Sequence, residues 1–309
     1  MADALIGTAV PILLLMGIGF LSRKFDLLKS GDERVLSSYV YYFALPARFI
    51  VDMAQTTFVT ETLVFIFAGI IPIFLVVAIF SLLYVTVRFS RNTFYLLTLS
   101  TIFGNTAFFG IPFVTFAFPS TQTEQTATLS AATIGIAAIA VSVALLEFYR
   151  LEKISKIQGL KYVGSRLLKN PLIVSIFVGI IISLVGIEIP LPLATVLDMI
   201  GGTTSAVAIF MLGAFLYGKK YTNLKVGFGL SLLRIILLPL IALATLMLFE
   251  LPIMEESVIV LMHAMPVAVA LSVLSERYNF HRETIASLTL VSSVGAIVYL
   301  NLWLALLGV

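Results

Sequence analysis

Two short stretches of the sequence place polar side chains next to residues that break helices. The first runs Gly104-Asn105-Thr106-Ala107-Phe108-Phe109-Gly110-Ile111-Pro112, and the second runs His263-Ala264-Met265-Pro266. Proline removes a backbone donor and clashes with the preceding turn, and glycine makes unwinding easier. A helix broken in this way exposes free N–H and C=O groups, and the half-helix that follows has a partially positive N-terminus that suits an anion. We therefore expect helix breaks at Pro112 and Pro266, with an anion-binding site beside them.

Three polar side chains beside these breaks are candidates for ligand contact. The amide of Asn105 can donate and accept, so it either holds a carboxylate or caps the freed backbone groups. Thr106 has the same two uses, because threonine also bonds to its own helix backbone. His263 either hydrogen-bonds a ligand, changes its protonation state, or stays neutral in a packed core. The candidate binding site consists of Asn105, Thr106, Gly110, Ile111, Pro112, His263, Met265 and Pro266.

Charged residues inside apolar segments form a second group. Arg48 lies four residues before Asp52, which favours a helical ion pair, and Asp198 is a further candidate partner. A charge in apolar surroundings is costly and usually faces a partner or a cavity, so attraction of an anion is the alternative role for Arg48. Arg234 lies closer to the end of its segment, where its side chain can extend to a polar surface.

The composition indicates that these residues belong to a membrane protein. The 309 residues are 60% hydrophobic and 11% charged, with a mean hydropathy of +1.11, whereas soluble domains carry roughly 25% charged residues. A membrane-spanning helix needs about 20 mainly apolar residues, and continuous apolar runs favour helices over alternating strands. We therefore expect an all-α integral membrane protein with ten transmembrane helices. The ten apolar spans are 3–22, 35–54, 61–87, 93–118, 126–149, 170–187, 192–217, 226–249, 255–277 and 284–307.

The distribution of basic residues predicts how these spans are oriented. Of the 19 Lys and Arg residues, all but Arg48 and Arg234 lie in the loops after spans 1, 3, 5, 7 and 9. The opposite loops carry only acidic charges, from Glu61, Glu124, Glu188, Glu250, Glu255 and Glu256. Because basic loops stay in the cytoplasm, we expect a multi-pass protein of the cell (inner) membrane with both termini outside.

The longest basic loop divides the chain into two sets of five spans. We expect a first repeat over 1–149, a cytoplasmic amphipathic linker over 150–169 that contacts membrane lipid, and a second repeat over 170–309. An odd number of spans per repeat forces the second repeat to insert upside down. Inverted repeats are common in secondary transporters, where the substrate site lies at discontinuous helices. Spans 4 and 9, the fourth of each repeat, are the spans that contain the two expected breaks.

The motifs resemble those of a known family. Asn105-Thr106, followed by Gly110-Ile111-Pro112, resembles the N-T-x-x-x-G-I-P signature of the auxin efflux carrier family, which includes plant auxin exporters and bacterial permeases for malate or malonate. Met265-Pro266 and the later run Tyr278-Asn279-Phe280-His281 also fit the family pattern. The chain lacks the long hydrophilic central loop of the plant exporters, so it resembles the short prokaryotic branch. Val267 and Ala268 replace a polar position of the plant pattern, which argues against auxin itself.

The resemblance implies a fold and a mechanism. Spans 1, 2, 6 and 7 would form a scaffold, and spans 3–5 and 8–10 a transport domain in which broken helices 4 and 9 cross. The implied function is secondary transport of a small organic anion, either auxin-like or a mono- or dicarboxylate, across the plasma membrane. The substrate would bind at the crossover and move by an elevator-type mechanism, commonly in a homodimer.

Other functions remain open or are disfavoured. A sodium-coupled organic anion symporter of the bile acid symporter type has a related crossover fold, but few acidic residues lie in the middle of the spans here. We expect no enzyme activity, because no HExxH, nucleophile elbow, paired membrane aspartates or P-loop is present. A channel or a membrane sensor stays open. With no cysteine and two histidines, we expect neither a metal site nor a cofactor. We also expect no nucleic-acid partner.

Overall fold

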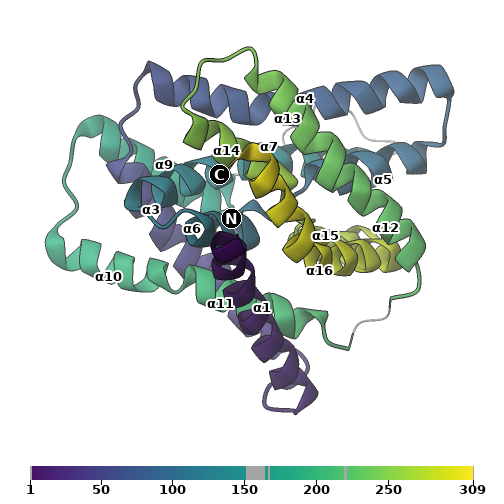
Figure 1. Cartoon of the computed structure of the whole chain (residues 1–309), viewed down its shortest axis with the longest axis horizontal. Coiled ribbons are helices and arrows are strands. Elements are labelled where there is room, and N and C mark those ends of the chain that lie inside the picture. Colours follow the sequence, from purple (N-terminus) through teal and green to yellow (C-terminus); the bar gives the residue numbers. More distant parts are fainter. Residues whose placement is uncertain (1, 151–163, 166–167, 219–220, 309) are drawn as a thin grey trace. The chain divides into compact units, whose positions relative to one another are not determined.

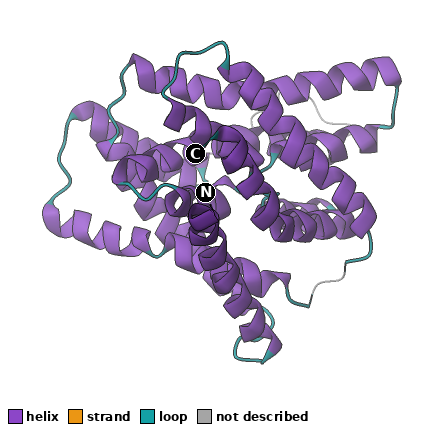
Figure 2. Cartoon of the chain, viewed as in Figure 1, coloured by secondary structure: helices purple, strands orange, loops and turns teal. Residues whose placement is uncertain are grey.

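The structure, a computed structural model, is built from helices, and it describes residues 2–150, 164–165, 168–218 and 221–308 (Figure 1). Within these residues no strand occurs (Figure 2), which confirms the all-α prediction for the described part. The α-helices are α1 (Ala2–Lys24), α2 (Asp32–Tyr39), α3 (Leu45–Gln55), α4 (Thr60–Val87), α5 (Arg91–Ile102), α6 (Ile111–Ala117), α7 (Thr121–Arg150), α9 (Pro171–Val185), α10 (Leu191–Gly202), α11 (Thr204–Leu216), α12 (Leu224–Leu232), α13 (Leu238–Leu246), α14 (Ile253–Ala264), α15 (Val269–Tyr278) and α16 (Arg282–Leu307).

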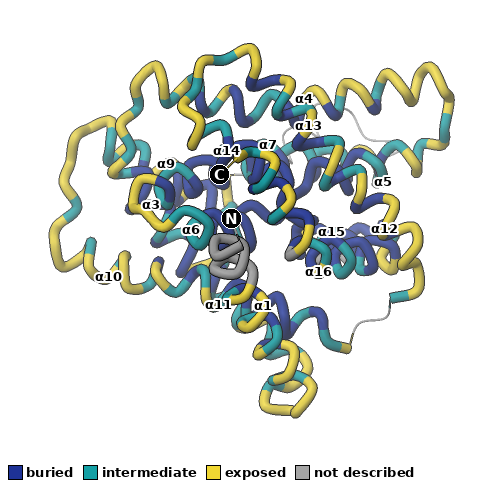
Figure 3. The backbone as a smooth tube through the Cα atoms, in the orientation of Figure 1, coloured by how far each residue is buried: buried dark blue, intermediate teal, exposed yellow. Residues whose placement is uncertain are grey.

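Four continuous stretches of the described chain are long and apolar enough to cross a membrane. They are Thr60–Val87, Thr121–Tyr149, Leu191–Leu216 and Leu224–Leu246, and the bent pair within α16 would make a fifth. Large apolar side chains stay exposed along α4 and α10, such as Phe67 at 59% and Leu191 at 79% (Figure 3). Lipid is the natural solvent for such surfaces. The count of ten spans stays a prediction, because several expected spans are short or interrupted as helices in this structure.

Three short π-helices share one sequence pattern, because each ends two residues before a proline. They are η1 (Val40–Ala44) before Pro46, η2 (Thr106–Gly110) before Pro112, and η3 (Leu233–Leu237) before Pro239. A proline in a helix cannot donate to the preceding turn and its ring crowds the carbonyl there. A wider turn with one extra residue relieves this crowding, and such π turns often occur at functional sites.

The ends of several helices follow from local sequence. Ser90 caps α5, because its side chain accepts a hydrogen bond from the backbone N–H of Thr93 at 3.1 Å. Asn170 caps α9 in the same way, and Pro171 follows it at the position where a missing N–H costs least. Gly186 ends α9 in a left-handed conformation with φ of 72°.

The chain divides into two compact units. Unit 1 consists of Met1–Leu63, Ala107–Ala132 and Asn170–Lys219. In this unit α1 packs closely on α11, because Gly19 faces the Phe210 carbonyl and Gly213 faces the Met16 carbonyl. Helix α3 packs on α9 through Gly179. Small residues of this kind let helix backbones approach closely where no water drives association.

Unit 2 consists of Val64–Thr106, Thr133–Lys169 and Lys220–Val309. It contains most of α4, α5, the later part of α7, and the helices from α12 onward. Helix α12 packs on α16 at Gly227, and α13 packs on α14. Many hydroxyl groups are buried here, including those of Thr101, Ser292 and Ser293. Most of the linker predicted over 150–169 lies outside the described residues.

Candidate functional site

Both expected helix breaks are present, and one of them lies at a different residue. The chain between α5 and η2 is not helical over 103–105, so the first break falls at Gly104 and not at Pro112. Pro112 is instead accommodated by the π turn η2 and becomes the second residue of α6. The prediction of a break at Pro112 is therefore wrong in its position. The second break lies between α14 and α15 and includes Pro266 itself.

The two breaks of unit 2 pair with each other as short extended segments. Gly104 and Val267 form an isolated antiparallel bridge. The backbone N–H of Asn105 donates to the Pro266 carbonyl at 2.7 Å, and the N–H of Ala268 donates to the Phe103 carbonyl at 3.0 Å. Each break thus satisfies backbone groups that the other leaves free, as their burial requires.

Two side chains complete the pairing of the breaks. The hydroxyl oxygen of Ser292, on α16, accepts the N–H of Val267 at 3.1 Å. Arg234, in η3, donates from Nε to the Met265 carbonyl at 2.9 Å and from Nη1 to the Thr101 carbonyl. Arg234 is 1% exposed, so the prediction that it extends to a polar surface is wrong. The bonding of Arg234 to the two breaks can be recognised only from the fold. The sequence did indicate that an arginine within an apolar span has some partner.

Asn105 and Thr106 are buried at the first break. The Nδ2 atom of Asn105 is buried and has no hydrogen-bond partner in the structure. A buried donor of this kind costs about 1–3 kcal/mol if it stays unpaired. Thr106 begins η2, and its Oγ1 lies 3.2 Å from where a Cβ on Gly135 would be. Asn105 therefore has both the position and the free donor that contact with a ligand requires.

The predicted residues from the second break have defined backbone or side-chain partners. The Nε2 atom of His263 lies 2.8 Å from the Gly69 carbonyl oxygen, which can only accept, so Nε2 carries a hydrogen. Its Nδ1 atom is buried without a partner. Met265 and Pro266 contribute carbonyl oxygens to the pairing, and their side chains are buried. His263 thus holds α14 to α4 within unit 2.

Three predicted site residues belong to the other unit. Gly110 ends η2, and Ile111 and Pro112 begin α6, which packs on α1 and α11 within unit 1. The eight residues of the predicted site are therefore divided, with Asn105, Thr106, His263, Met265 and Pro266 in unit 2.

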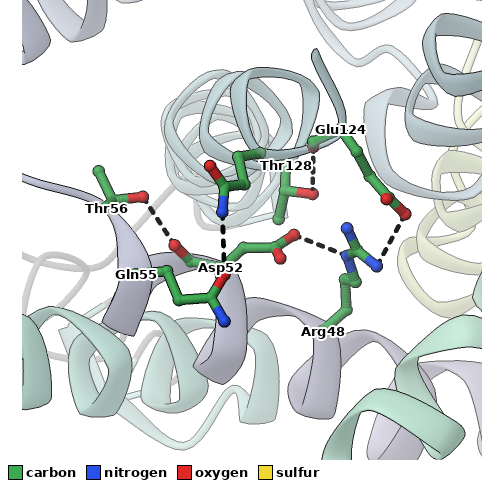
Figure 4. A network of polar contacts seen from close by, with 7 residues as sticks. Arg48, Asp52, Gln55, Thr56, Glu124 and Thr128 are labelled. Atoms are coloured by element: carbon green, nitrogen blue, oxygen red, sulfur yellow. Dashed lines mark hydrogen bonds and ion pairs between the residues drawn. The ribbon is translucent and has the colours of Figure 1, made fainter. Parts of the chain in front are cut away.

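Unit 1 contains a separate polar network around Arg48 (Figure 4). Arg48 pairs with Asp52 at 2.6 Å, from Nε to Oδ2, and with Glu124 at 2.7 Å, from Nη1 to Oε1. Asp198 is exposed and takes part in no ion pair of the described chain. Two carboxylates against one guanidinium leave no net positive charge, which opposes the attraction of an anion by Arg48. Glu124 was missed as a partner, because the sequence placed it only in a loop.

The network around Arg48 continues through amides and hydroxyls. Gln125 donates from Nε2 to Oε1 of Gln55 at 2.9 Å, which joins α7 to α3 beside the ion pairs (Figure 4). Thr56 donates to the Asp52 carbonyl and its own carbonyl accepts from Ser183. These bonds connect α3, α7 and α9. The described residues contain no group of three or more side chains suited to a metal ion.

The sequence of the chain is similar to those of known membrane proteins. The family model described as "Membrane transport protein" matches residues 4–304. The chain is 24% identical over 309 residues to the "Uncharacterized transporter YfdV" of Escherichia coli K12, covering 97% of this chain and 96% of the relative, and the Shigella flexneri protein of that name gives the same values. It is 25% identical over 316 residues to the "Lysosomal cholesterol signaling protein" of Mus musculus, covering 93% of this chain and 36% of that protein.

Proposed function

Because the chain belongs to the membrane transport protein family, to which the auxin efflux carriers belong, and is a membrane transporter, we propose that it moves a small organic anion by secondary transport. A mono- or dicarboxylate, or an auxin-like acid, binds at the paired breaks of unit 2. The observation that carries this proposal is the buried, unpartnered Nδ2 donor of Asn105 at the point where the breaks meet.

The surroundings of Asn105 favour an anion over a neutral solute. Each break is followed by the start of a helix, η2 at Thr106 and α15 at Val269. The N-terminus of a helix carries a partial positive charge and free N–H groups. A carboxylate oxygen can accept from the Asn105 amide and from such N–H groups together, which removes the cost of the unpaired donor.

We further propose that ten spans in two inverted repeats cross the cell membrane with both termini outside, and that the protein works as an elevator in a homodimer. Unit 1 contains the helices of expected spans 1, 2, 6 and 7, which supports a scaffold role for it. Unit 1 also includes α6 and the beginning of α7. In the proposed cycle, unit 2 binds the anion at its paired breaks, carries it across, and releases it on the other side.

Proteoliposome flux tests the proposal directly. Purified protein is reconstituted, and uptake of radiolabelled malonate, malate and indole-3-acetate is measured with and without a sodium gradient. We expect saturable uptake of at least one acid, a large loss in Asn105→Ala, and no loss in Asn92→Ala, an exposed asparagine at the start of α5. Equal uptake by the Asn105→Ala variant would contradict the site. Uptake that requires sodium would favour the symporter alternative.

A further inference from the structure

We propose that the guanidinium group of Arg234 is a built-in cation that holds the two paired breaks together at a place where transporters with broken helices can bind a mobile cation. The pairing of 103–105 with 265–268 then needs no bound metal or alkali ion. The structural part of this proposal stands on the contacts of Arg234. Its consequence, that transport needs no sodium at this position, rests on the proposed transport function.

The contacts of Arg234 lie at the ends of two helices. Thr101 belongs to the last turn of α5, and Met265 directly follows the last residue of α14. Both carbonyl oxygens accept from the same guanidinium. The C-terminus of a helix carries roughly −0.5 of an elementary charge. Two such ends carry about −1 together, which one guanidinium balances.

Among the described residues, no acidic side chain pairs with Arg234. The ion pairs in the part of the chain that the structure describes involve Arg23 and Arg48, and none involves Arg234. Arg234 is nevertheless 1% exposed. A buried charge without compensation is strongly unfavourable, so the helix ends must supply the negative charge. Arg234 and the two breaks therefore depend on each other electrostatically.

Carbonyl oxygens at the ends of broken helices are a recognised setting for cations. In secondary transporters, unwound carbonyls and half-helix C-termini coordinate sodium ions or protons. Here the same kind of oxygen, from Thr101 and Met265, is occupied by Arg234. Arginine suits this position because its planar, permanently charged group donates in two directions at once.

The helix that carries Arg234 is shaped to present it. Arg234 lies in the π turn η3, which ends two residues before Pro239. A π turn leaves carbonyls without their usual partners, and the indole Nε1 of Trp303 donates to the Ile235 carbonyl at 2.9 Å. The widened turn is thus held by α16 and is not a loose distortion of the helix.

Chemical rescue tests the proposal. The variant Arg234→Ala leaves two helix ends facing an empty space the size of a guanidinium group. We expect its thermal unfolding temperature in detergent to fall well below that of the wild type, and low, non-denaturing guanidinium chloride to raise it again. Choline chloride at equal ionic strength should leave it unchanged, and guanidinium should not raise the wild type. The matched control is Arg34→Ala, an exposed arginine on α2, which should unfold at the wild-type temperature.

Further arms keep the test decisive if Arg234→Ala does not fold. Arg234→Lys retains the charge and Arg234→Met retains most of the volume, so we expect the lysine variant to unfold at a higher temperature than the methionine variant. Equal temperatures, a methionine variant as stable as the wild type, or absence of guanidinium rescue would each overturn the proposal. In flux, wild-type uptake that requires sodium would overturn the coupling consequence. Absence of any uptake, with guanidinium rescue intact, would count against the proposed function alone.

Discussion

The guanidinium group of Arg234 lies so close to Gly104 that there is no room for a side chain at position 104. A Cβ atom on Gly104 would lie 1.7 Å from Nη2 of Arg234 and 2.6 Å from its Cζ. Because both residues are buried and the guanidinium is fixed by two carbonyls, the arginine cannot move aside without losing its bonds. The residue directly before the N-T-x-x-x-G-I-P motif therefore has to be a glycine because of Arg234, which lies in another helix.

The variant Gly104→Ala should be strongly destabilised. Overpacking of a buried site typically costs about 1–3 kcal/mol, and displacing the buried guanidinium from its carbonyls adds to this cost. We expect a clear drop in thermal unfolding temperature, and a double variant with Arg234→Ala that loses less than the sum of the two single losses. Gly17→Ala on α1 is the control, because nothing lies within 4 Å of its Cβ position. If the losses of unfolding temperature in the two single variants were additive, the alanine at position 104 would not clash directly with the Arg234 side chain.

Removing Arg48 should cost more than removing Glu124. Arg48→Ala leaves the carboxylate of Asp52, which is 4% exposed, without its cation, whereas the Glu124 side chain is 31% exposed and solvent can replace its partner. Loss of one partner of a fully buried pair costs about 3–5 kcal/mol, and partial exposure of Arg48 reduces this. We expect the thermal unfolding temperature of Glu124→Gln to be higher than that of Arg48→Ala.

A neutral amide at position 52 should partly rescue the Arg48 variant. Asp52→Asn removes the charge that Arg48→Ala leaves unpaired, so the double variant should unfold at a higher temperature than Arg48→Ala alone. Asp198→Asn serves as a control at an exposed carboxylate. If Asp52→Asn gave no recovery, the ion pair would not be the source of the loss.

We expect His281 to make the folded protein less stable at acidic pH. Partial burial lowers the pKa of this histidine, between α15 and α16, below its ordinary value of 6.5. The folded state therefore favours the neutral ring, and stability should fall as the pH decreases through about 6.5, where the unfolded chain takes up the proton first. His281→Asn should flatten this part of the profile of unfolding temperature against pH. Asparagine suits the left-handed backbone at this position, where φ is 40°. An unchanged profile would show that other groups titrate there.

Periodic and compositional features of the fold were predictable from the sequence, whereas contacts between distant segments were not. Continuous apolar runs predicted helices, and the described chain is helical without strands. Pro266 marked a real break, since α14 ends two residues before it, whereas Pro11 and Pro72 lie inside the continuous helices α1 and α4. Pro112 does not mark a break, because the π turn η2 accommodates it. Similar π turns precede Pro46 and Pro239. Sequence alone does not separate these two outcomes.

Part of the geometry around the candidate site was predictable, while the ligand-binding role of its residues stays a prediction. Asn105 was identified from its type and its neighbours, and the structure places it at the paired breaks with a free donor. The position of Arg234 against Thr101 depends on bringing together residues 133 positions apart. Glu124 reaches Arg48 for the same reason, from another helix. Contacts between such distant residues can be identified only in the three-dimensional structure, since neither the periodicity nor the spacing of residues in the sequence indicates them.

The close contact of α1 with α11 in unit 1 should depend on two glycines that face each other's helix. A Cβ on Gly19 would lie 1.9 Å from the Phe210 carbonyl oxygen, and a Cβ on Gly213 would lie 2.0 Å from that of Met16. Backbone atoms cannot yield as a side chain can, so Gly19→Ala and Gly213→Ala must push the helices apart, although alanine is the better helix former. We expect both variants to unfold at lower temperatures in detergent, while Gly202→Ala, which has open space at its Cβ position, stays at or above the wild type. Wild-type unfolding temperatures for Gly19→Ala and Gly213→Ala would mean that α1 and α11 do not pack this closely.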